Sequence, residues 1–262
     1  MGRFASTVPY YQRCREPYPP AFFQRTAAAL RLDGSQALID LGCGPGLLAL
    51  GFAPFVRSAA GVDPEPAMIA AAREAAALEG RSIDLIESRT EGLPVSLGSF
   101  DVVTIGRALH WMAPGPTLAL LDRCVRPDGF IVICRASSVE GRANPWLATY
   151  KEFRLRVSPE KDRAKYGVDA PSFFAGSAFS LAETVAVEFR QTISMDTLTG
   201  RLFSMSNTSP ELLGSQAAQT GAELRAVLSP FTADGETIEE LVEAQAVIFA
   251  RPGRQPLSKP VS

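Results

Sequence analysis

Residues 38–46 place tight constraints on the fold, because an apolar run is followed at once by three closely spaced glycines. The run Ala37–Leu41 contains a single acid, Asp40, and otherwise has the composition of a strand buried on both faces of a parallel sheet. The glycines then occupy every second position: Gly42, Gly44 and Gly46. Glycines let the chain turn sharply and let bare backbone approach a ligand, while Leu47 restarts as a helix whose first N–H groups face that ligand. The stretch therefore predicts a site for a nucleoside-bearing cofactor.

The spacing of these glycines is G-x-G-x-G, whereas dinucleotide-binding proteins use G-x-G-x-x-G at the same place. Leu47 stands where the dinucleotide pattern has its third glycine, and Asp40 precedes the first glycine by two positions. This pattern resembles the first motif of the class I S-adenosylmethionine (SAM) methyltransferases. The resemblance implies that Asp40 orients the ammonium group of SAM, directly or through water. It also implies that the turn contacts the methionine part of SAM through Gly42, Cys43, Gly44 and Gly46.

A second acid ends the next predicted strand. The segment Ala59–Asp63 is apolar up to Asp63, which lies 17 residues after Gly46. A carboxylate here can accept hydrogen bonds from both ribose hydroxyls, but dinucleotide-binding proteins place an acid there too. Asp63 is also a good N-cap for the helix that follows. Pro64 is grouped with this site, and Met68 one turn on either packs on the adenine or belongs to the core.

Residues 36–135 alternate predicted strands with predicted helices, which is typical of a parallel sheet with helices on both faces. The further elements expected in this region are a helix at 66–79, a strand at 83–86, a strand at 100–105, a helix at 117–124, a turn at 126–129 and a strand at 129–134. Strand-like segments return at 184–193 and 244–250, and the resemblance makes them the sixth and seventh strands. We therefore predict an α/β protein with a doubly wound, seven-stranded, mostly parallel sheet, the Rossmann-like methyltransferase fold.

We expect five segments along the chain. They are an N-terminal helical lid (1–33), a SAM-binding core (34–135), a helical insertion or substrate cap after the fifth strand (136–183), the remaining strands with their helices (184–252) and a disordered tail (253–262). Asn144-Pro145 opens the predicted helix of the insertion, which runs to about residue 156 and is followed by a charged stretch at 159–165.

Aromatic and arginine residues precede the helix predicted at 21–32, among them Tyr11, Arg15 and Tyr18. In the small-molecule SAM enzymes that this chain resembles, a similar segment folds over the cofactor pocket. The alternative is that these side chains only pack the helix onto the sheet. We group them with Trp111 and Trp146 as expected substrate or lid residues.

The segment Ser88–Pro94 follows the third predicted strand and resembles the acid-Ala-Glu-x-Leu-Pro segment of the family. Arg89 replaces the acid that usually accepts a hydrogen bond from the adenine amino group. The resemblance leaves adenine recognition to main-chain groups near Thr90 and Glu91, and we expect Arg89 to be a solvated surface residue.

The segment Gly106–Trp111 follows the fourth predicted strand, where the family often has a small-x-x-His-Trp sequence that lines the sulfonium side of the cofactor. Its His110 is the only histidine, and imidazole can take a proton near neutral pH because its reference pKa is about 6.5. The alternative is that His110 only shapes the pocket wall. Arg107 could bind a carboxylate of substrate or cofactor, or form a surface ion pair, and Leu109 is grouped with the cofactor contacts.

Composition limits the expected partners. The chain has 262 residues, of which 46% are hydrophobic, and its net charge of −2 disfavours broad contact with nucleic acid. No apolar run approaches the roughly 20 residues of a membrane span, and residues 1–4 lack the apolar stretch of a secretory signal, so we expect a cytoplasmic protein without membrane contact. Four cysteines without C-x-x-C spacing and a single histidine argue against a metal site.

Taken together, the residues and the resemblance predict a SAM-dependent methyltransferase of the type 11 group, similar to the trans-aconitate-type enzymes. We expect it to act as a monomer or homodimer, to methylate an O- or N-nucleophile of a small metabolite, and to release S-adenosylhomocysteine. One alternative is an NAD(P)-dependent oxidoreductase, which the glycine spacing and the lack of a Tyr-x-x-x-Lys pair disfavour. The other is a catalytically silent SAM-binding module, which Arg89 favours.

Overall fold

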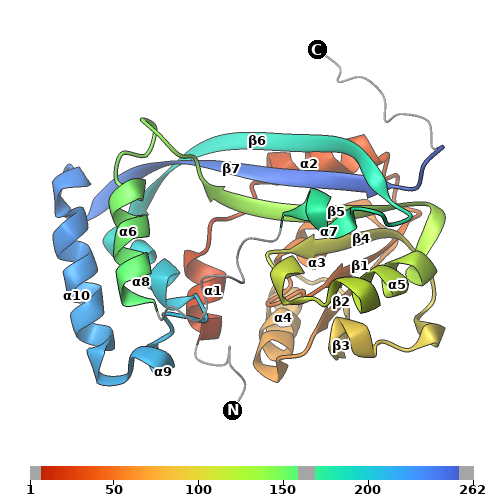
Figure 1. The fold of residues 1–262 in the computed structure, drawn as a ribbon, viewed down its shortest axis with the longest axis horizontal. Helices are drawn as coiled ribbons and strands as arrows, with labels where there is room; N and C mark the ends of the chain where they lie inside the picture. The colour runs from red at the N-terminus through yellow and green to blue at the C-terminus, as the bar shows by residue number, and fades with distance from the viewer. Residues whose placement is uncertain (1–6, 159–168, 254–262) are drawn as a thin grey trace. The chain divides into compact units, whose positions relative to one another are not determined.

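The computed structural model describes residues 7–158 and 169–253 (Figure 1). These residues divide into two compact units that are each assembled from three pieces of chain. Unit 1 comprises the described residues of Met1–Pro17, Ala136–Tyr166 and Glu188–Glu243, and unit 2 comprises those of Tyr18–Arg135, Gly167–Val187 and Ala244–Ser262.

Seven strands form one sheet in the order β3-β2-β1-β4-β5-β7-β6. Their bounds are β1 (Ala37–Leu41), β2 (Ser58–Asp63), β3 (Asp84–Glu87), β4 (Phe100–Gly106), β5 (Val125–Ser138), β6 (Ser180–Ser194) and β7 (Thr237–Ala250). The first four lie wholly in unit 2, whereas β5, β6 and β7 each cross from one unit into the other. The predicted α/β class and the seven-stranded, doubly wound sheet are confirmed.

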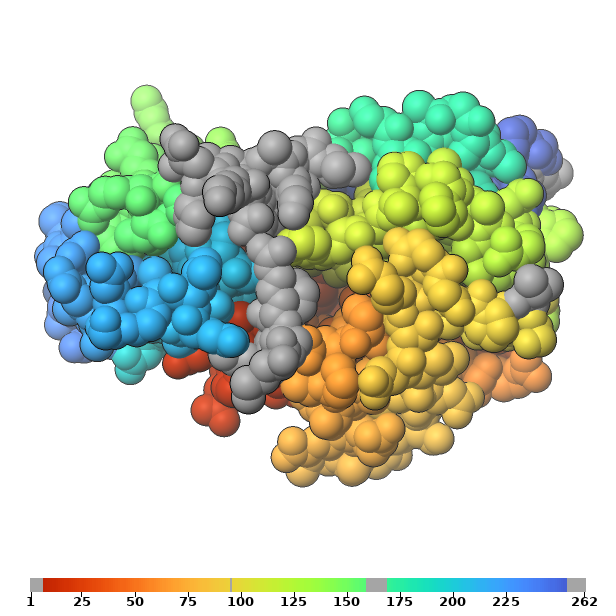
Figure 2. All heavy atoms as spheres, turned by 60° about the horizontal axis from the view of Figure 1, so that its bottom comes forward, coloured from red at the N-terminus to blue at the C-terminus, as the bar shows by residue number. Residues whose placement is uncertain are grey.

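Unit 2 holds the predicted cofactor residues. Its helices are α2 (Pro20–Leu30), α3 (Leu47–Phe52), α4 (Pro66–Leu78), α5 (Pro114–Cys124) and α7 (Ala170–Phe174), with 3₁₀ turns η2 (Ala53–Phe55), η3 (Thr90–Gly92), η4 (Val95–Leu97) and η5 (Leu109–Trp111). The stretch from α4 to η4 reaches the surface in Figure 2, where it is coloured orange to yellow. β1 pairs in parallel with both β2 and β4. The strand order therefore reverses direction at β1, the point where open α/β sheets bind their ligands.

Apolar side chains that alternate along the central strands fill one face of this sheet. Ile39 and Leu41 of β1 and Ile105 of β4 form one hydrophobic cluster with Leu121 of α5 and Phe174 of α7. Residues at even spacing along a strand share a face, so this pattern is what a strand covered by helices requires.

The helices α2 and α3 form a second packed layer of unit 2. α3 packs on β1, β2 and β4, and α2 packs on α3. Phe23 of α2 lies edge-to-face on Phe52 of α3, with ring centroids 5.0 Å apart. Gly51 makes this approach possible, because a Cβ there would lie 2.1 Å from the Phe23 ring. The N-terminal proline of α2 and the packing of its two phenylalanines explain why this segment is helical.

Unit 1 has a separate hydrophobic core. Its helices are α1 (Val8–Cys14), α6 (Leu147–Val157), α8 (Met195–Phe203), α9 (Pro210–Leu213) and α10 (Ala217–Leu228), with η7 (Gly214–Gln216) and η8 (Ser229–Phe231). Side chains from α6, α8, α10 and β7 share one cluster that includes Trp146, Leu198, Leu224 and Ile238. α10 packs against α6, and both reach the surface of unit 1 in Figure 2, where α10 is blue and α6 is green.

The predicted turn at 126–129 does not separate helix α5 from strand β5, because β5 already begins at Val125. Phe100 pairs with Val125 and Val102 pairs with Phe130, so the residues between them are extra residues in an irregular part of the ladder. A bulge of this kind accommodates extra residues within a strand, so the turn-forming residues at 126–129 belong to β5. α5 also begins at Pro114, three residues before its predicted start.

Two predicted segments cannot be compared with the fold. The charged stretch at 159–165 lies outside the described residues, and so does the expected tail from residue 254 onward. Among the residues that are described, no helix has both the length and the apolar character needed to cross a membrane.

Candidate functional site

The glycine loop between β1 and α3 uses backbone conformations that favour glycine. Gly42, Gly44 and Gly46 have φ angles of +70°, +53° and +85°. The N–H groups of Gly42 and Cys43 both donate to the carbonyl of Val62, at 2.8 and 2.9 Å, which fixes the loop to the end of β2. A Cβ on Gly42 would lie 2.4 Å from Cβ of Ala108, so this position also needs glycine for space.

Gly44 differs from Gly42 because space is open beside it. A Cβ built on Gly44 has a single atom within 4 Å, the Sδ of Met68 at 3.9 Å. Met68 itself is 4% exposed and belongs to α4. The loop thus exposes bare backbone next to a buried thioether, as expected where a ligand approaches the main chain.

Asp63 connects the end of β2 to the glycine loop. Its Oδ2 accepts a hydrogen bond from the N–H of Gly44, and its Oδ1 accepts one from the N–H of Glu65, both at 2.9 Å. Burial raises the pKa of the Asp63 carboxyl, while the two N–H bonds oppose the shift. Glu65 occupies the N-cap position of α4 and makes no side-chain cap hydrogen bond, so Asp63 is not the N-cap residue of this helix. Each carboxylate oxygen accepts one N–H and keeps a further lone pair for a ligand hydroxyl.

Asp40 is a buried acid at the centre of the sheet. Its Oδ1 accepts a hydrogen bond from the Thr104 hydroxyl at 2.9 Å, and the two residues are paired across β1 and β4. Burial raises the pKa of Asp40 to about 7, the Thr104 hydrogen bond opposes this, and the charge of Asp63 adds to it. Its protonation therefore changes near neutral pH, and a nearby cation would favour the ionised form.

Cys43 and Pro64 flank this pair of acids. Cys43 is 6% exposed, and a Cβ on Gly61 would lie 2.9 Å from its Sγ, so the thiol packs on β2. Burial raises the pKa of Cys43 well above its ordinary value, which keeps the thiol protonated and unreactive. Pro64 is exposed.

The third segment brings Thr90 and Glu91 into η3. Thr90 is buried, and Glu91 Oε1 accepts a hydrogen bond from the N–H of Ala113 at 3.1 Å, which ties this segment to the start of α5. The Arg89 side chain is 76% exposed and lies 3.8 Å from Glu91. Its predicted surface position is confirmed.

The fourth segment leaves β4 through a strained residue. Arg107 has φ +55° although it is not glycine, and its guanidinium lies 5.2 Å from the centroid of the Tyr18 ring. The His110 and Trp111 rings are neighbours, with centroids 4.9 Å apart. Leu109 is 6% exposed and packs in the hydrophobic cluster of unit 2. Left-handed backbone at a non-glycine residue is uncommon and occurs more often at ligand sites than elsewhere.

The expected substrate and lid residues are divided between the units. Tyr11 and Arg15 belong to unit 1, where the Arg15 guanidinium lies 5.1 Å from the centroid of the Tyr11 ring, and Tyr18 belongs to unit 2. Trp146 was expected to face a substrate, and the structure places it elsewhere. It is 1% exposed, packs in the core of unit 1 and donates through Nε1 to the carbonyl of Glu239. Its burial leaves no face for a ligand.

Within unit 2 the structure connects the first two predicted sites directly, through the bond from Gly44 to Asp63. The residue missed from the sequence is Thr104. A hydroxyl side chain inside an apolar strand was the available signal, because buried hydroxyls need a partner.

Comparison with known proteins agrees with this geometry. The family model described as a methyltransferase domain matches residues 39–133. An uncharacterized methyltransferase of Schizosaccharomyces pombe is 33% identical over 134 residues, which cover 48% of this chain and 50% of that protein. The chain spans about half the length of the curated relatives it matches.

Solved structures share the fold over most of the chain. One is proposed to be a type II methyltransferase of Anaeromyxobacter dehalogenans, with a TM-score of 0.61, 22% identity and coverage of 90% of this chain and 97% of that chain. Another is a SAM-dependent methyltransferase of Geobacter sulfurreducens in complex with S-adenosylhomocysteine, with a TM-score of 0.56, 18% identity and coverage of 96% and 98%. At these identities the likeness concerns the fold. Residues 39–133 are therefore similar to a methyltransferase domain, and the chain shares its fold with solved methyltransferases.

Proposed function

We propose that this chain transfers the methyl group of SAM to an O- or N-nucleophile of a small metabolite and releases S-adenosylhomocysteine. When bound, SAM would supply an activated methyl group on a sulfonium, so the protein has to align the reactants and exclude water rather than provide a catalytic triad. The observation that carries the proposal is the bond from Gly44 to Asp63, because it joins a glycine loop with open backbone to an acid that keeps lone pairs for a ribose.

Each residue of unit 2 then has a proposed task. Asp63 would accept the ribose hydroxyls, Asp40 would orient the ammonium group, and Gly42–Gly46 would contact the methionine part. His110 would take the proton of a hydroxyl or amine acceptor, and Arg107 would bind a carboxylate. The remaining proposed cofactor contacts are Cys43, Pro64, Met68, Thr90, Glu91 and Leu109. The small-molecule acceptor, the cytoplasmic location and the lid formed by residues 1–33 stay predictions.

A Val at Gly44 is expected to weaken binding of S-adenosylhomocysteine at least about tenfold, because a branched side chain would fill the space that the ligand needs beside the loop. The measurement is calorimetric titration of wild type and Gly44→Val with S-adenosylhomocysteine, with NAD titrated in parallel. Wild type should bind the first ligand and not the second.

The control for this prediction is Gly80→Val. Gly80 has φ +61°, close to the +53° of Gly44, and a Cβ there would meet nothing within 4 Å. Both variants therefore carry a similar backbone strain, and only one lies in the loop. Unchanged affinity in a folded Gly44→Val protein, or tighter binding of NAD than of S-adenosylhomocysteine, would overturn the proposed function.

The affinity for S-adenosylhomocysteine is expected to rise about tenfold between pH 6 and pH 8. With the pKa of Asp40 at about 7 in the unliganded protein, about a tenth of the carboxyl is ionised at pH 6 and about nine tenths at pH 8. A bound ammonium group lowers that pKa, so binding releases a proton and strengthens as the pH rises. Asp40→Asn leaves the ionisable groups of the ligand unchanged, so the difference between the two pH profiles reports the contribution of Asp40. Equal pH profiles would contradict this role.

A further inference from the structure

One face of α6 in unit 1 carries two polar residues four positions apart, Tyr150 and Arg154, and the polar Ser158 follows as the C-cap of this helix. The segment that follows α8 lies against this face. Arg154 Nη1 is 4.0 Å from the Sδ of Met205, and Asn207 Nδ2 donates to the Ser158 hydroxyl at 3.1 Å. The face of α6 and the segment 204–207 therefore form the two sides of one polar region.

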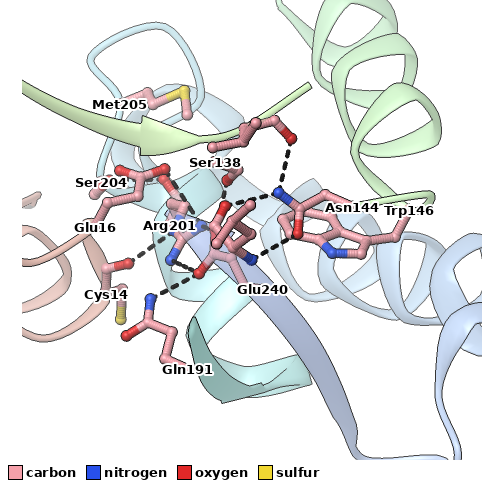
Figure 3. Close-up of polar contacts among 12 residues, drawn as sticks. Cys14, Glu16, Ser138, Asn144, Trp146, Gln191, Arg201, Ser204, Met205 and Glu240 are labelled. Atoms are coloured by element: carbon pink, nitrogen blue, oxygen red, sulfur yellow. Dashed lines mark hydrogen bonds and ion pairs between the residues drawn. The ribbon is translucent and has the colours of Figure 1, made fainter. Parts of the chain in front are cut away.

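Arg15 reaches the same segment from the N-terminal part of unit 1. Its Nη2 donates to the carbonyl of Ser204 at 3.3 Å, one residue before Met205. Figure 3 shows Ser204 and Met205 on the same side of the cluster as Glu16. The Nε of Arg15 is buried and has no hydrogen-bond partner among the described residues. A buried guanidinium N–H without an acceptor is costly, because the group has lost water and gained nothing in exchange.

Tyr150 also has a buried polar atom without a hydrogen-bond partner among the described residues. It is 4% exposed, and its hydroxyl is buried without a partner within the described chain. Burial raises the pKa of this hydroxyl far above its ordinary value, the Arg201 charge opposes the shift, Glu16 adds to it, and Arg15 and Arg154 oppose it. The hydroxyl is therefore a protonated hydrogen-bond donor that feels the charges of three guanidinium groups and one carboxylate.

The charges around this hydroxyl do not cancel. Arg201 pairs with Glu240 at 2.6 Å and with Glu16 at 3.3 Å, so both acids are engaged by one arginine. Neither Arg15 nor Arg154 has a carboxylate within ion-pair distance among the residues that the structure describes. The cations Arg15, Arg154 and Arg201 and the anions Glu16 and Glu240 together carry one net positive charge. Two buried donors, the Nε of Arg15 and the Tyr150 hydroxyl, have no acceptor among the described residues.

We propose that Arg15, Tyr150 and Arg154 form a binding site for the carboxylate of a small organic acid. A carboxylate supplies one negative charge and acceptor oxygens in the plane that a guanidinium fork prefers. A phosphate would bring nearly two negative charges to a cluster with a surplus of one. The site goes beyond the proposed function, because the methyl transfer is derived from unit 2 alone and all three residues lie in unit 1.

The experiment uses the full chain and five probes at constant ionic strength: acetate, benzoate, the matched neutral amides acetamide and benzamide, and inorganic phosphate. Ligand-detected NMR titration should show saturable binding of at least one carboxylate and of neither amide. Tyr150→Phe removes the hydroxyl alone and should weaken that binding at least tenfold, as should Arg154→Met. The melting temperature of Tyr150→Phe should be no lower than that of wild type, because the lost hydroxyl has no partner among the described residues.

Arg156→Met is the matched control, since this arginine is on the same helix but its side chain is 61% exposed and pairs with Glu223. It should bind the carboxylate like wild type. No saturable binding of either carboxylate, equal binding by Tyr150→Phe, or tighter binding of inorganic phosphate would each overturn the site. Titration of the same samples with S-adenosylhomocysteine reports on unit 2, so a failure of the carboxylate site is distinguished from a failure of the proposed methyl transfer.

Discussion

Replacing Asp63 with Ala is expected to weaken binding of S-adenosylhomocysteine by about 2 to 4 kcal/mol, which is roughly 30- to 1,000-fold in dissociation constant. The first reason is the loss of two charge-assisted hydrogen bonds to the ribose. The second is the loss of the acceptor for the N–H groups of Gly44 and Glu65, which fixes the loop before any ligand arrives.

Two further variants separate these reasons. Asp63→Asn keeps one carbonyl oxygen, which can accept one of the two N–H groups, so its affinity should lie between those of wild type and Asp63→Ala. Asp84→Ala removes an exposed acid at the first residue of β3, paired with Ala60 of β2 and away from the glycine loop, and it should bind like wild type. Calorimetry gives the affinities, and circular dichroism checks the fold. A change of less than a few-fold in a folded Asp63→Ala protein would exclude the ribose role.

Replacing Arg201 with Met is expected to lower the free energy of unfolding by about 3 to 5 kcal/mol, because it leaves a buried carboxylate without its partner. Arg201 donates to both oxygens of Glu240, at 2.6 and 3.1 Å, and through Nε to the carbonyl of Cys14 at 3.0 Å (Figure 3). Glu240 is fully buried and Arg201 is 2% exposed, so water cannot replace these bonds.

A second variant removes the Glu240 charge that Arg201→Met leaves without its partner. In Arg201→Met with Glu240→Gln, the neutral amide still has Ser138 and Gln191 as neighbours, at 2.5 and 2.7 Å, and at least half of the lost stability should return. Arg225→Met is the control, because this arginine is 37% exposed and its ion pairs with Asp196 and Glu236 lie at the surface, where a pair contributes about 1 kcal/mol or less. Urea denaturation of the four proteins measures the differences. Equal losses for Arg201→Met and Arg225→Met would show that burial does not set the strength of this pair.

The part of the fold that could be predicted is the part with a local signal. β1, β2 and β4 are short apolar runs between turn residues. The glycines after β1 adopt positive φ angles, which glycine favours whatever the distant parts of the chain do. Asp40 and Asp63 could be found because ligand groups in open sheets gather at the carboxyl ends of strands. Thr104 was missed because its partner Asp40 is 64 residues away.

The core of unit 1 had no comparable signal. Arg201 is 39 residues from Glu240 and 187 from Cys14, and a lone arginine in a helical pattern looks like a solvated surface residue. Trp146 illustrates the same limit from the other direction, since a tryptophan after a proline can face a ligand or the core. Only the packing of α6 against its neighbours determines which of the two environments Trp146 has, and that packing depends on contacts between residues far apart in the chain.

The assembly of unit 1 from three pieces of chain has a consequence for biosynthesis. A ribosome releases the chain from its first residue onward, so α1 emerges before any other element that it packs with. Its partner α8 and Glu240, the acid that pairs with Arg201, belong to residues 188–243, which are synthesised long after α1. β1 to β4 are complete by residue 106. α1 therefore reaches its native contacts with α8 only after Met195–Phe203 has been synthesised.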